Sequence, residues 1–333
     1  MKKICLIVFV SLIFSLSIHA KSKKEKTIVK VDGSSTVYLI TEAVAEKFQE
    51  SKKGSIHVTV GISGTGGGFE KFCKGEIDIA DASRPIEQKE INSCKDKKIT
   101  YVELPIGYDA LTVVVNPKNT WVNSMTVAEL KKLWEPTPEG QTPITQWNQI
   151  NPTWPKTKIS LYGPGAKSGT FDYFTKAIVG KEKSSRADYM PSEDDNTTVT
   201  GVAGDENALG YFGFAYYSEN MDKLKAIAID SGKGTVIPSQ EAVEHGTYQP
   251  LSRPLFIYVN TQSLKKKHVK EFAEFYVNNA QTLVADVKYV PFQKAEYDMV
   301  KVRLMGMQQG TVFAGKAEAG LKIKEILQRK PKI

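Results

Sequence analysis

The sequence has few of the residues on which most catalytic and metal sites depend. Four histidines and three cysteines occur among 333 residues, and neither a CxxC nor an HExxH spacing is present, which argues against zinc and redox centres. The glycine-rich stretches match neither GxxxxGK[ST] nor GxGxxG, and Ser168 does not lie in a GxSxG turn. The sequence therefore predicts no metal, no cofactor and no enzymatic activity.

The sequence also lacks a strong excess of charge. The net charge is +8, and the densest basic stretches, 21–26 and 265–267, carry no interleaved aromatic residues. A protein that binds nucleic acid usually shows a stronger basic stripe, so we expect no nucleic-acid partner. Hydrophobic residues make up 41% of the chain, which is ordinary for a folded protein, and the length favours two domains.

One long apolar run is present, at the start of the chain. Residues 4–18 are almost wholly apolar, Lys2 and Lys3 precede them, and Ala20 and the charged stretch 21–26 follow. This order is typical of a cleavable secretory signal peptide, which we place at residues 1–20. The run is shorter than the ~20 residues that a membrane-spanning helix needs. We therefore expect an exported, periplasmic protein.

The three cysteines fit this compartment. Cys5 lies inside the apolar run rather than directly after the cleavage point, so the sequence has no lipobox and we expect no lipid anchor. Cys73 and Cys94 remain after cleavage, and an even number of cysteines in an exported chain favours one disulfide bond. Two reduced, buried thiols are the alternative.

The hydrophobic pattern alternates between short strands and amphipathic helices. Three strands, at 28–31, 56–60 and 159–161, each lead through a polar loop into a helical stripe, at 37–48, 69–73 and 171–178. Such alternation predicts an α/β fold with mostly parallel sheets. We also expect strands at 77–79, 101–105, 111–115, 209–217, 226–229 and 255–260, helices at 127–134, 264–286 and 314–328, and a polar loop at 181–205.

Three polar loops, 33–36, 61–68 and 163–170, share one arrangement. Each follows a strand, combines glycine with serine or threonine, and opens a helix. The first N–H groups of a helix have no partner within it, and the helix dipole adds positive charge there. Ordinary N-capping would explain any one loop. Three such loops, with Ser83 and Arg84 at another strand end, together favour a pocket for an anion.

At these loops the sequence resembles the PstS family, the periplasmic phosphate-binding proteins of phosphate ABC transporters. The resemblance runs from about residue 31 to 320. It rests on the order and spacing of six strings: DGSST at 32–36, GTGGGFEKFC at 64–73, DIADASRPI at 78–86, GPG at 163–165, SGTF at 168–171 and NALGYFGFAYY at 207–217.

The resemblance implies a two-lobed periplasmic binding protein fold of type II-like topology. Each lobe would hold a mixed sheet flanked by helices, with two crossovers at the hinge. We place lobe 1 at 27–111 plus 253–333 and lobe 2 at 112–252. The implied function is to capture inorganic phosphate between the lobes, as a monomer, and to deliver it to a membrane permease.

Matching the motifs residue by residue gives a predicted site. The backbone of Val37 belongs to the first loop, and the second loop carries an ambiguity between Ser63 and Gly64. The implied phosphate-binding residues are Ser35, Thr36, Val37, Ser63, Gly64, Thr65, Ser83, Arg84, Ser168, Gly169 and Thr170.

The chain departs from the family at two positions. Many members carry an arginine shortly before Ser-Gly-Thr, where this chain has residues 164–167. The family's phosphate-facing aspartate aligns with Ser83. We therefore expect Arg84, or alternatively Arg186, to supply the positive charge, because a guanidinium suits phosphate oxygens. Asp81 is a candidate acceptor for the phosphate proton.

These departures leave other functions open. A receptor for another oxyanion, such as sulfate, molybdate or a phosphonate, would use the same kind of pocket. A secreted phosphatase would need metals or an activated nucleophile, which the few histidines do not favour. A surface adhesin built on the same fold would bind no small anion.

Overall fold

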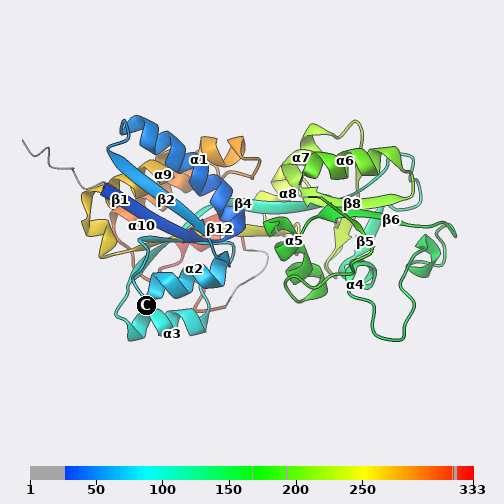
Figure 1. Ribbon diagram of the computed structural model, residues 1–333, viewed down its shortest axis with the longest axis horizontal. Coiled ribbons are helices and arrows are strands. Elements are labelled where there is room, and N and C mark those ends of the chain that lie inside the picture. The colour runs from blue at the N-terminus through cyan, green and yellow to red at the C-terminus, as the bar shows by residue number, and fades with distance from the viewer. Residues whose placement is uncertain (1–26, 167, 193, 317, 319–320) are drawn as a thin grey trace, which may run out of the picture.

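The computed structural model describes residues 27–333 apart from 167, 193, 317, 319 and 320. The predicted signal peptide lies outside the described residues. Two lobes lie side by side, and strands β4 (Tyr101–Val115) and β12 (Ser252–Asn260) connect them (Figure 1). Within the described part of the chain, no helix is long and apolar enough to cross a membrane.

The first lobe is built on one half of a long sheet, in the strand order β2-β1-β3-β12-β4. Strand β1 (Thr27–Gly33) pairs in parallel with β2 (Ile56–Ile62) and β3 (Ile79–Ala82). Helices α1 (Ser35–Ser51) and α9 (Lys267–Asp286) pack together, with Phe48 of α1 against Phe272 of α9 at 5.2 Å between ring centroids. The other helices of this lobe are α2 (Gly64–Cys73), α3 (Gln88–Asp96), α10 (Lys294–Met305) and α11 (Ile323–Gln328).

The second lobe continues the same sheet through β4, β8 (Ala208–Gly213), β6 (Ser160–Pro164) and β7 (Met190–Ser192). Phe174, at the end of α5 (Gly169–Phe174), stacks on Tyr211 of β8 at 3.7 Å between centroids, and this contact anchors α5 to the sheet. The remaining α-helices and strands of this lobe are α4 (Val127–Trp134), α6 (Asp195–Gly204), α7 (Phe214–Glu219), α8 (Gln240–Glu244), β9 (Lys225–Ala226) and a small sheet of β5 (Ser124–Thr126), β10 (Ala228–Asp230) and β11 (Thr235–Val236).

Strand β4 passes from one lobe into the other. It pairs with β12 as far as Ala110 and with β8 from Leu111 onward. The prediction of two separate strands here was wrong. Pro105 has no N–H group to donate to a neighbouring strand, yet it does not end β4. The pairing of β4 with β12 changes register between Leu255 and Phe256, and the missing hydrogen bond of Pro105 falls at this irregularity.

The sheet is mixed, as the family resemblance implied, and not mostly parallel. The antiparallel pairs involve the crossover strands: β12 with β3 and β4, and β4 with β8 and β9. The strands that belong to one lobe alone, such as β1, β2 and β6, pair in parallel. The strand–helix alternation therefore predicted the interior of each lobe and missed the strands that join them.

Several predicted elements differ in extent. The glycine-rich loop 61–68 already contains the start of α2, the polar loop 181–205 contains β7 and α6, and the strand at 209–217 ends at Gly213 before α7. Helix α10 was not predicted, although Tyr297, Val300 and Leu304 form its buried stripe. Of the predicted helix 314–328, the described residues are helical over α11 alone.

The predicted disulfide is confirmed. Cys73, at the end of α2, is bonded to Cys94 of α3, and both residues are buried. The bond joins α2, which begins within the second polar loop, to α3, which follows the segment that contains Arg84.

Replacing Cys73 and Cys94 together by alanine is expected to lower the free energy of unfolding by about 3 kcal/mol. The bond closes a loop of 21 residues, and this length sets the entropy that it removes from the unfolded chain. Denaturant unfolding of the oxidised protein and the double variant measures the difference. A change below about 1 kcal/mol would contradict a stabilising role.

Candidate functional site

A cavity of about 1010 Å³ lies between the two lobes. It is lined by the starts of α1 and α2, the segment after β3, helix α5 and the start of β12. Of the predicted site residues, the cavity lining contains Ser35, Thr36, Ser63, Gly64, Thr65, Ser83, Arg84 and Gly169. The lining does not contain Val37, Asp81, Ser168, Thr170 or Arg186.

The start of α1 forms one wall of this cavity. Ser34 is the N-cap, and its side chain accepts a hydrogen bond from the Val37 backbone at 3.4 Å. The Val37 N–H group therefore bonds within the first turn of α1, and Val37 does not line the cavity. Ser35 and Thr36, at the first two helical positions, do line the cavity, and their N–H groups have no acceptor within the helix.

Gly169, the first residue of α5, brings the second lobe against this helix start. A Cβ atom built on Gly169 would lie 2.5 Å from Thr36 Oγ1 and 2.9 Å from Ser35 Oγ, closer than real Cβ atoms approach other atoms. It would also lie 3.0 Å from the Thr36 backbone nitrogen, which is an unusually tight contact. Ser168 acts as the N-cap of α5 by accepting from the Thr170 backbone at 3.1 Å. Two predicted loops from different lobes thus meet at one point.

The second predicted loop forms the adjoining wall. Helix α2 begins at Gly64, whose φ of 75° lies in the region that favours glycine. Thr65 and Ser83 are hydrogen-bonded to each other through their hydroxyl groups at 3.1 Å. Ser63 donates to the carboxylate of Asp32 instead of presenting its hydroxyl to the cavity.

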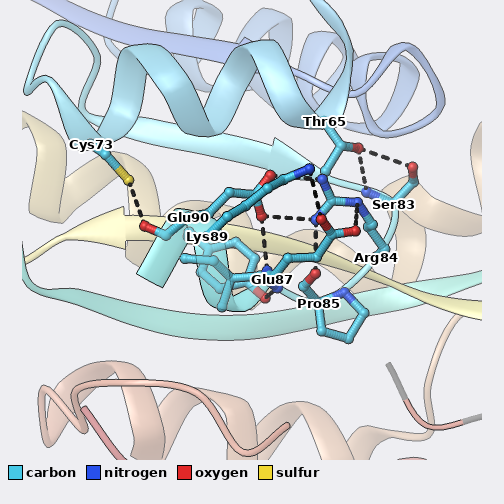
Figure 2. Close-up of polar contacts among 10 residues, drawn as sticks. Thr65, Cys73, Ser83, Arg84, Pro85, Glu87, Lys89 and Glu90 are labelled. Carbon is cyan, nitrogen blue, oxygen red and sulfur yellow. Dashed lines mark hydrogen bonds and ion pairs between the residues drawn. The ribbon is translucent and has the colours of Figure 1, made fainter. Parts of the chain in front are cut away.

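Arg84 lines the cavity, but acidic side chains already hold its guanidinium group. Figure 2 shows that group between Glu87 and Glu90. Its two terminal nitrogens donate to the Glu90 carboxylate at 2.9 and 2.7 Å, and Nε lies 3.3 Å from Glu87. Burial opposes the charge of Arg84, yet Glu90 and Glu87 raise its pKa overall. Whether Arg84 also binds an anion stays a prediction.

Arg253 is a cavity residue that was not predicted from the sequence. It lies near the start of β12, where its guanidinium carbon is 3.7 Å from the ring centroid of Tyr173, and its Nη2 donates to Thr36 Oγ1 at 3.2 Å. Nη2 also donates to Asp109 of β4 at 3.1 Å. Burial raises the pKa of Asp109, although Arg253 opposes this effect. Arg253 therefore joins the start of α1, α5 and both crossover strands.

Two residues that were predicted to contact the anion, Arg186 and Asp81, do not line the cavity. Arg186 is buried behind α4, where it donates to Asp188 at 2.6 and 2.7 Å and to the Leu133 carbonyl at 2.9 Å. Asp81 is completely buried, and burial raises its pKa well above the ordinary value. Its backbone, rather than its carboxyl group, supports the site, because the Asp81 carbonyl accepts from Ser34 N at 3.0 Å.

The assembled cavity is suited to an anion. It combines hydroxyl groups, the N-terminal ends of α1 and α2, and the guanidinium group of Arg253, all of which donate hydrogen bonds or carry positive charge. No histidine occurs among the described lining residues, so they contain no serine–histidine pair. The arrangement can bind and orient an oxyanion.

Comparisons with known proteins agree with this geometry. The family model for the PBP superfamily domain matches residues 20–280. Protein SphX of Synechocystis sp. is 49% identical over 319 residues, covering 96% of this chain and 94% of that protein. The phosphate-binding protein PstS of Staphylococcus saprophyticus is 38% identical over 282 residues, covering 84% and 85%. The crystal structure of a possible phosphate binding protein from Planctomyces limnophilus aligns with a TM-score of 0.79 and 45% identity, covering 84% and 98%.

Proposed function

Because the chain belongs to the PBP superfamily and, within it, to the PstS family of phosphate-binding proteins, we propose that it is an exported receptor that captures inorganic phosphate between its lobes and delivers it to the permease of an ABC transporter. The observation that carries this proposal is the meeting of the α1 helix start, Gly169 and Arg253 in one cavity.

We place the phosphate at the start of α1. The N–H groups and hydroxyls of Ser35 and Thr36 would donate to its oxygens, and the helix dipole favours its negative charge there. Arg253 would supply positive charge and the N–H donors of Nη1, because its Nε and Nη2 already donate to Asp109 and Thr36. Thr36 Oγ1 and Asp109 already hold the guanidinium group in place, so little side-chain entropy would be lost on binding.

The remaining predicted residues take supporting parts in this proposal. The second loop, with Gly64 and Thr65, and the Ser83–Arg84 pair would complete the first-lobe wall. Ser168 and Thr170 would form the turn that presents Gly169. We propose that the receptor works as a monomer and without a cofactor.

Binding would be coupled to a hinge motion. We assign residues 27–111 with 253–333 to one moving lobe and 112–252 to the other, joined at β4 and β12. The contact between Gly169 and Thr36 would form as the lobes approach each other. A closed form that encloses phosphate would then be the form that a permease recognises.

Calorimetric titration of the phosphate-stripped mature protein tests this function. We expect one phosphate to bind per chain with micromolar or tighter affinity, and an excess of sulfate to leave that binding intact. A chromogenic phosphate ester should yield no product under the same conditions. Absence of a phosphate signal, or its loss in sulfate, would favour a receptor for another oxyanion, and turnover of the ester would favour a phosphatase.

A further inference from the structure

Two short segments of the first lobe are rich in lysine. Residues 95–98 and 265–270 together contain seven lysines and one aspartate, while the net charge of the whole chain is only +8. The first segment spans the end of α3 and the turn that precedes β4, and the second lies at the start of α9. All seven lysines are exposed to solvent. A large share of the positive excess of the chain is therefore presented by these two segments.

The pairing of β4 with β12 brings the two segments together. Tyr101, the first residue of β4, lies opposite Asn260, the last residue of β12. Just beyond this pair, the Thr261 N–H group donates to the Thr100 carbonyl at 3.0 Å. The lysine-rich segments therefore leave the sheet at the same end and form one surface, which we call the basic end (residues 95–98 and 265–270).

The basic end is remote from the cavity between the lobes. Strand β4 leads away from it through the first lobe into the second (Figure 1). At about 3.3 Å per residue of strand, Tyr101 lies roughly 26 Å from Asp109, the partner of Arg253. Among the described residues that line the cavity, none belongs to the basic end. A partner bound there would leave the cavity open and both crossover strands free to bend.

Acidic neighbours compensate only part of this charge. Three of the seven lysines have a carboxylate within 4 Å: Lys266 with Asp78, Lys267 with Glu271 and Lys270 with Glu274. The described ion pairs include none of the other four, which are Lys95, Lys97, Lys98 and Lys265. Exposed ion pairs hold their partners only weakly, so most of these ammonium groups can turn toward an external negative charge.

We propose that the basic end binds the surface of an anionic phospholipid membrane. A lysine is a compact charge on a flexible stem and lacks the planar donors of arginine, so a lysine cluster suits a diffuse negative surface better than one defined group. No aromatic residue lies within either segment, although a surface for nucleic acid would favour stacking side chains. Membrane contact at this end would hold the protein near a permease while its cavity stays accessible. This inference does not depend on which ligand the cavity takes.

Co-sedimentation of the mature protein with lipid vesicles tests this inference. At low ionic strength, vesicles of phosphatidylcholine with about 30 mol% phosphatidylglycerol should bind wild-type protein, and vesicles of phosphatidylcholine alone should not. Salt at about 0.5 M should release the bound protein, because it screens exposed charges. Each lysine near an anionic surface strengthens binding about fivefold, so the triple variant Lys97→Gln/Lys98→Gln/Lys265→Gln should bind about a hundredfold more weakly.

The matched control is Lys118→Gln/Lys156→Gln/Lys233→Gln, which removes the same charge from exposed positions of the second lobe. Its binding to the anionic vesicles should stay close to that of wild type, and phosphate affinity should be unchanged in both triple variants.

Four results would overturn the inference: no binding of wild-type protein to the anionic vesicles, equal binding to both kinds of vesicle, an equal loss in the control variant, or tighter binding to a DNA duplex than to the anionic vesicles. The last of these would indicate a nucleic-acid partner instead. Failure of wild-type protein to bind phosphate would refute the proposed function and leave the vesicle result as it stands.

Discussion

Replacing Arg253 by methionine is expected to lower phosphate affinity at least a hundredfold. Methionine keeps much of the apolar stem but removes two charge-assisted hydrogen bonds to the ligand. At about 1.5–3 kcal/mol for each such bond, their loss amounts to about 3 kcal/mol or more. Arg253→Lys should recover part of the affinity, because it restores the charge without the planar pair of donors. Calorimetric titration with phosphate measures both changes.

Loss of Arg253 would also leave Asp109 buried without its partner, so a stability control is needed. The double variant Asp109→Asn/Arg253→Met removes the unpaired charge and should restore much of the thermal stability while phosphate binding stays lost. Arg84→Met, by comparison, should weaken binding less than Arg253→Met, since Arg84 is paired with two carboxylates, Glu87 and Glu90, whereas the carboxylate paired with Arg253 is Asp109. Phosphate affinity of Arg253→Met within threefold of wild type would refute the assignment of Arg253.

The second large effect is expected at Gly169. Changing Gly169 to alanine should lower phosphate affinity at least tenfold, because the added methyl group would overlap Thr36 Oγ1 and approach the Thr36 backbone. The Thr36 hydroxyl is hydrogen-bonded to Arg253 and cannot turn away without losing that contact, so the two lobes would be held apart at the binding point. Each lobe should stay folded, and thermal stability should therefore change little.

Small-angle X-ray scattering with and without phosphate complements the titration of this variant. Wild-type protein should become more compact with phosphate, and Gly169→Ala should respond less. Gly204→Ala is the matched control: it makes the same change in the second lobe, where the new methyl group meets nothing within 4 Å. Wild-type affinity in Gly169→Ala would show that the contact between the lobes is not part of binding.

The sequence predicted best those helices and strands whose hydrophobic pattern can be read within a single segment. The stripe of Val269, Phe272, Tyr276 and Leu283 identified α9, and all four side chains are buried. The crossover strand β4 was harder to predict, because Pro105 reads as a strand end unless the irregular pairing with β12 is known. Helix α10 was missed because apolar residues occur on its exposed face as well as its buried one: Val302 and Met305 are exposed.

Site residues that lie within one strand–loop–helix segment could be predicted from the sequence, whereas residues brought in from distant segments could not. A strand, a glycine–hydroxyl loop and a helix start follow one another along the chain, so Ser35, Thr36 and Gly169 could be found. Arg253 is far from them in sequence and reaches Thr36 only through the pairing of β12 with β4. One signal was present, since an arginine between two prolines at the entrance to the buried strand 255–260 is out of place in a core. Likewise, nothing local distinguished Arg84, held by Glu90, from a free cation.

The most direct measurement is a crystal structure of the protein grown without phosphate and then soaked in it. The account predicts one tetrahedral anion between the lobes, within hydrogen-bond distance of the Thr36 backbone nitrogen and of the Arg253 guanidinium group, and with Gly169 beside it. An anion bound at Arg84 and away from Arg253, or a cleft that stays empty at saturating phosphate, would contradict it.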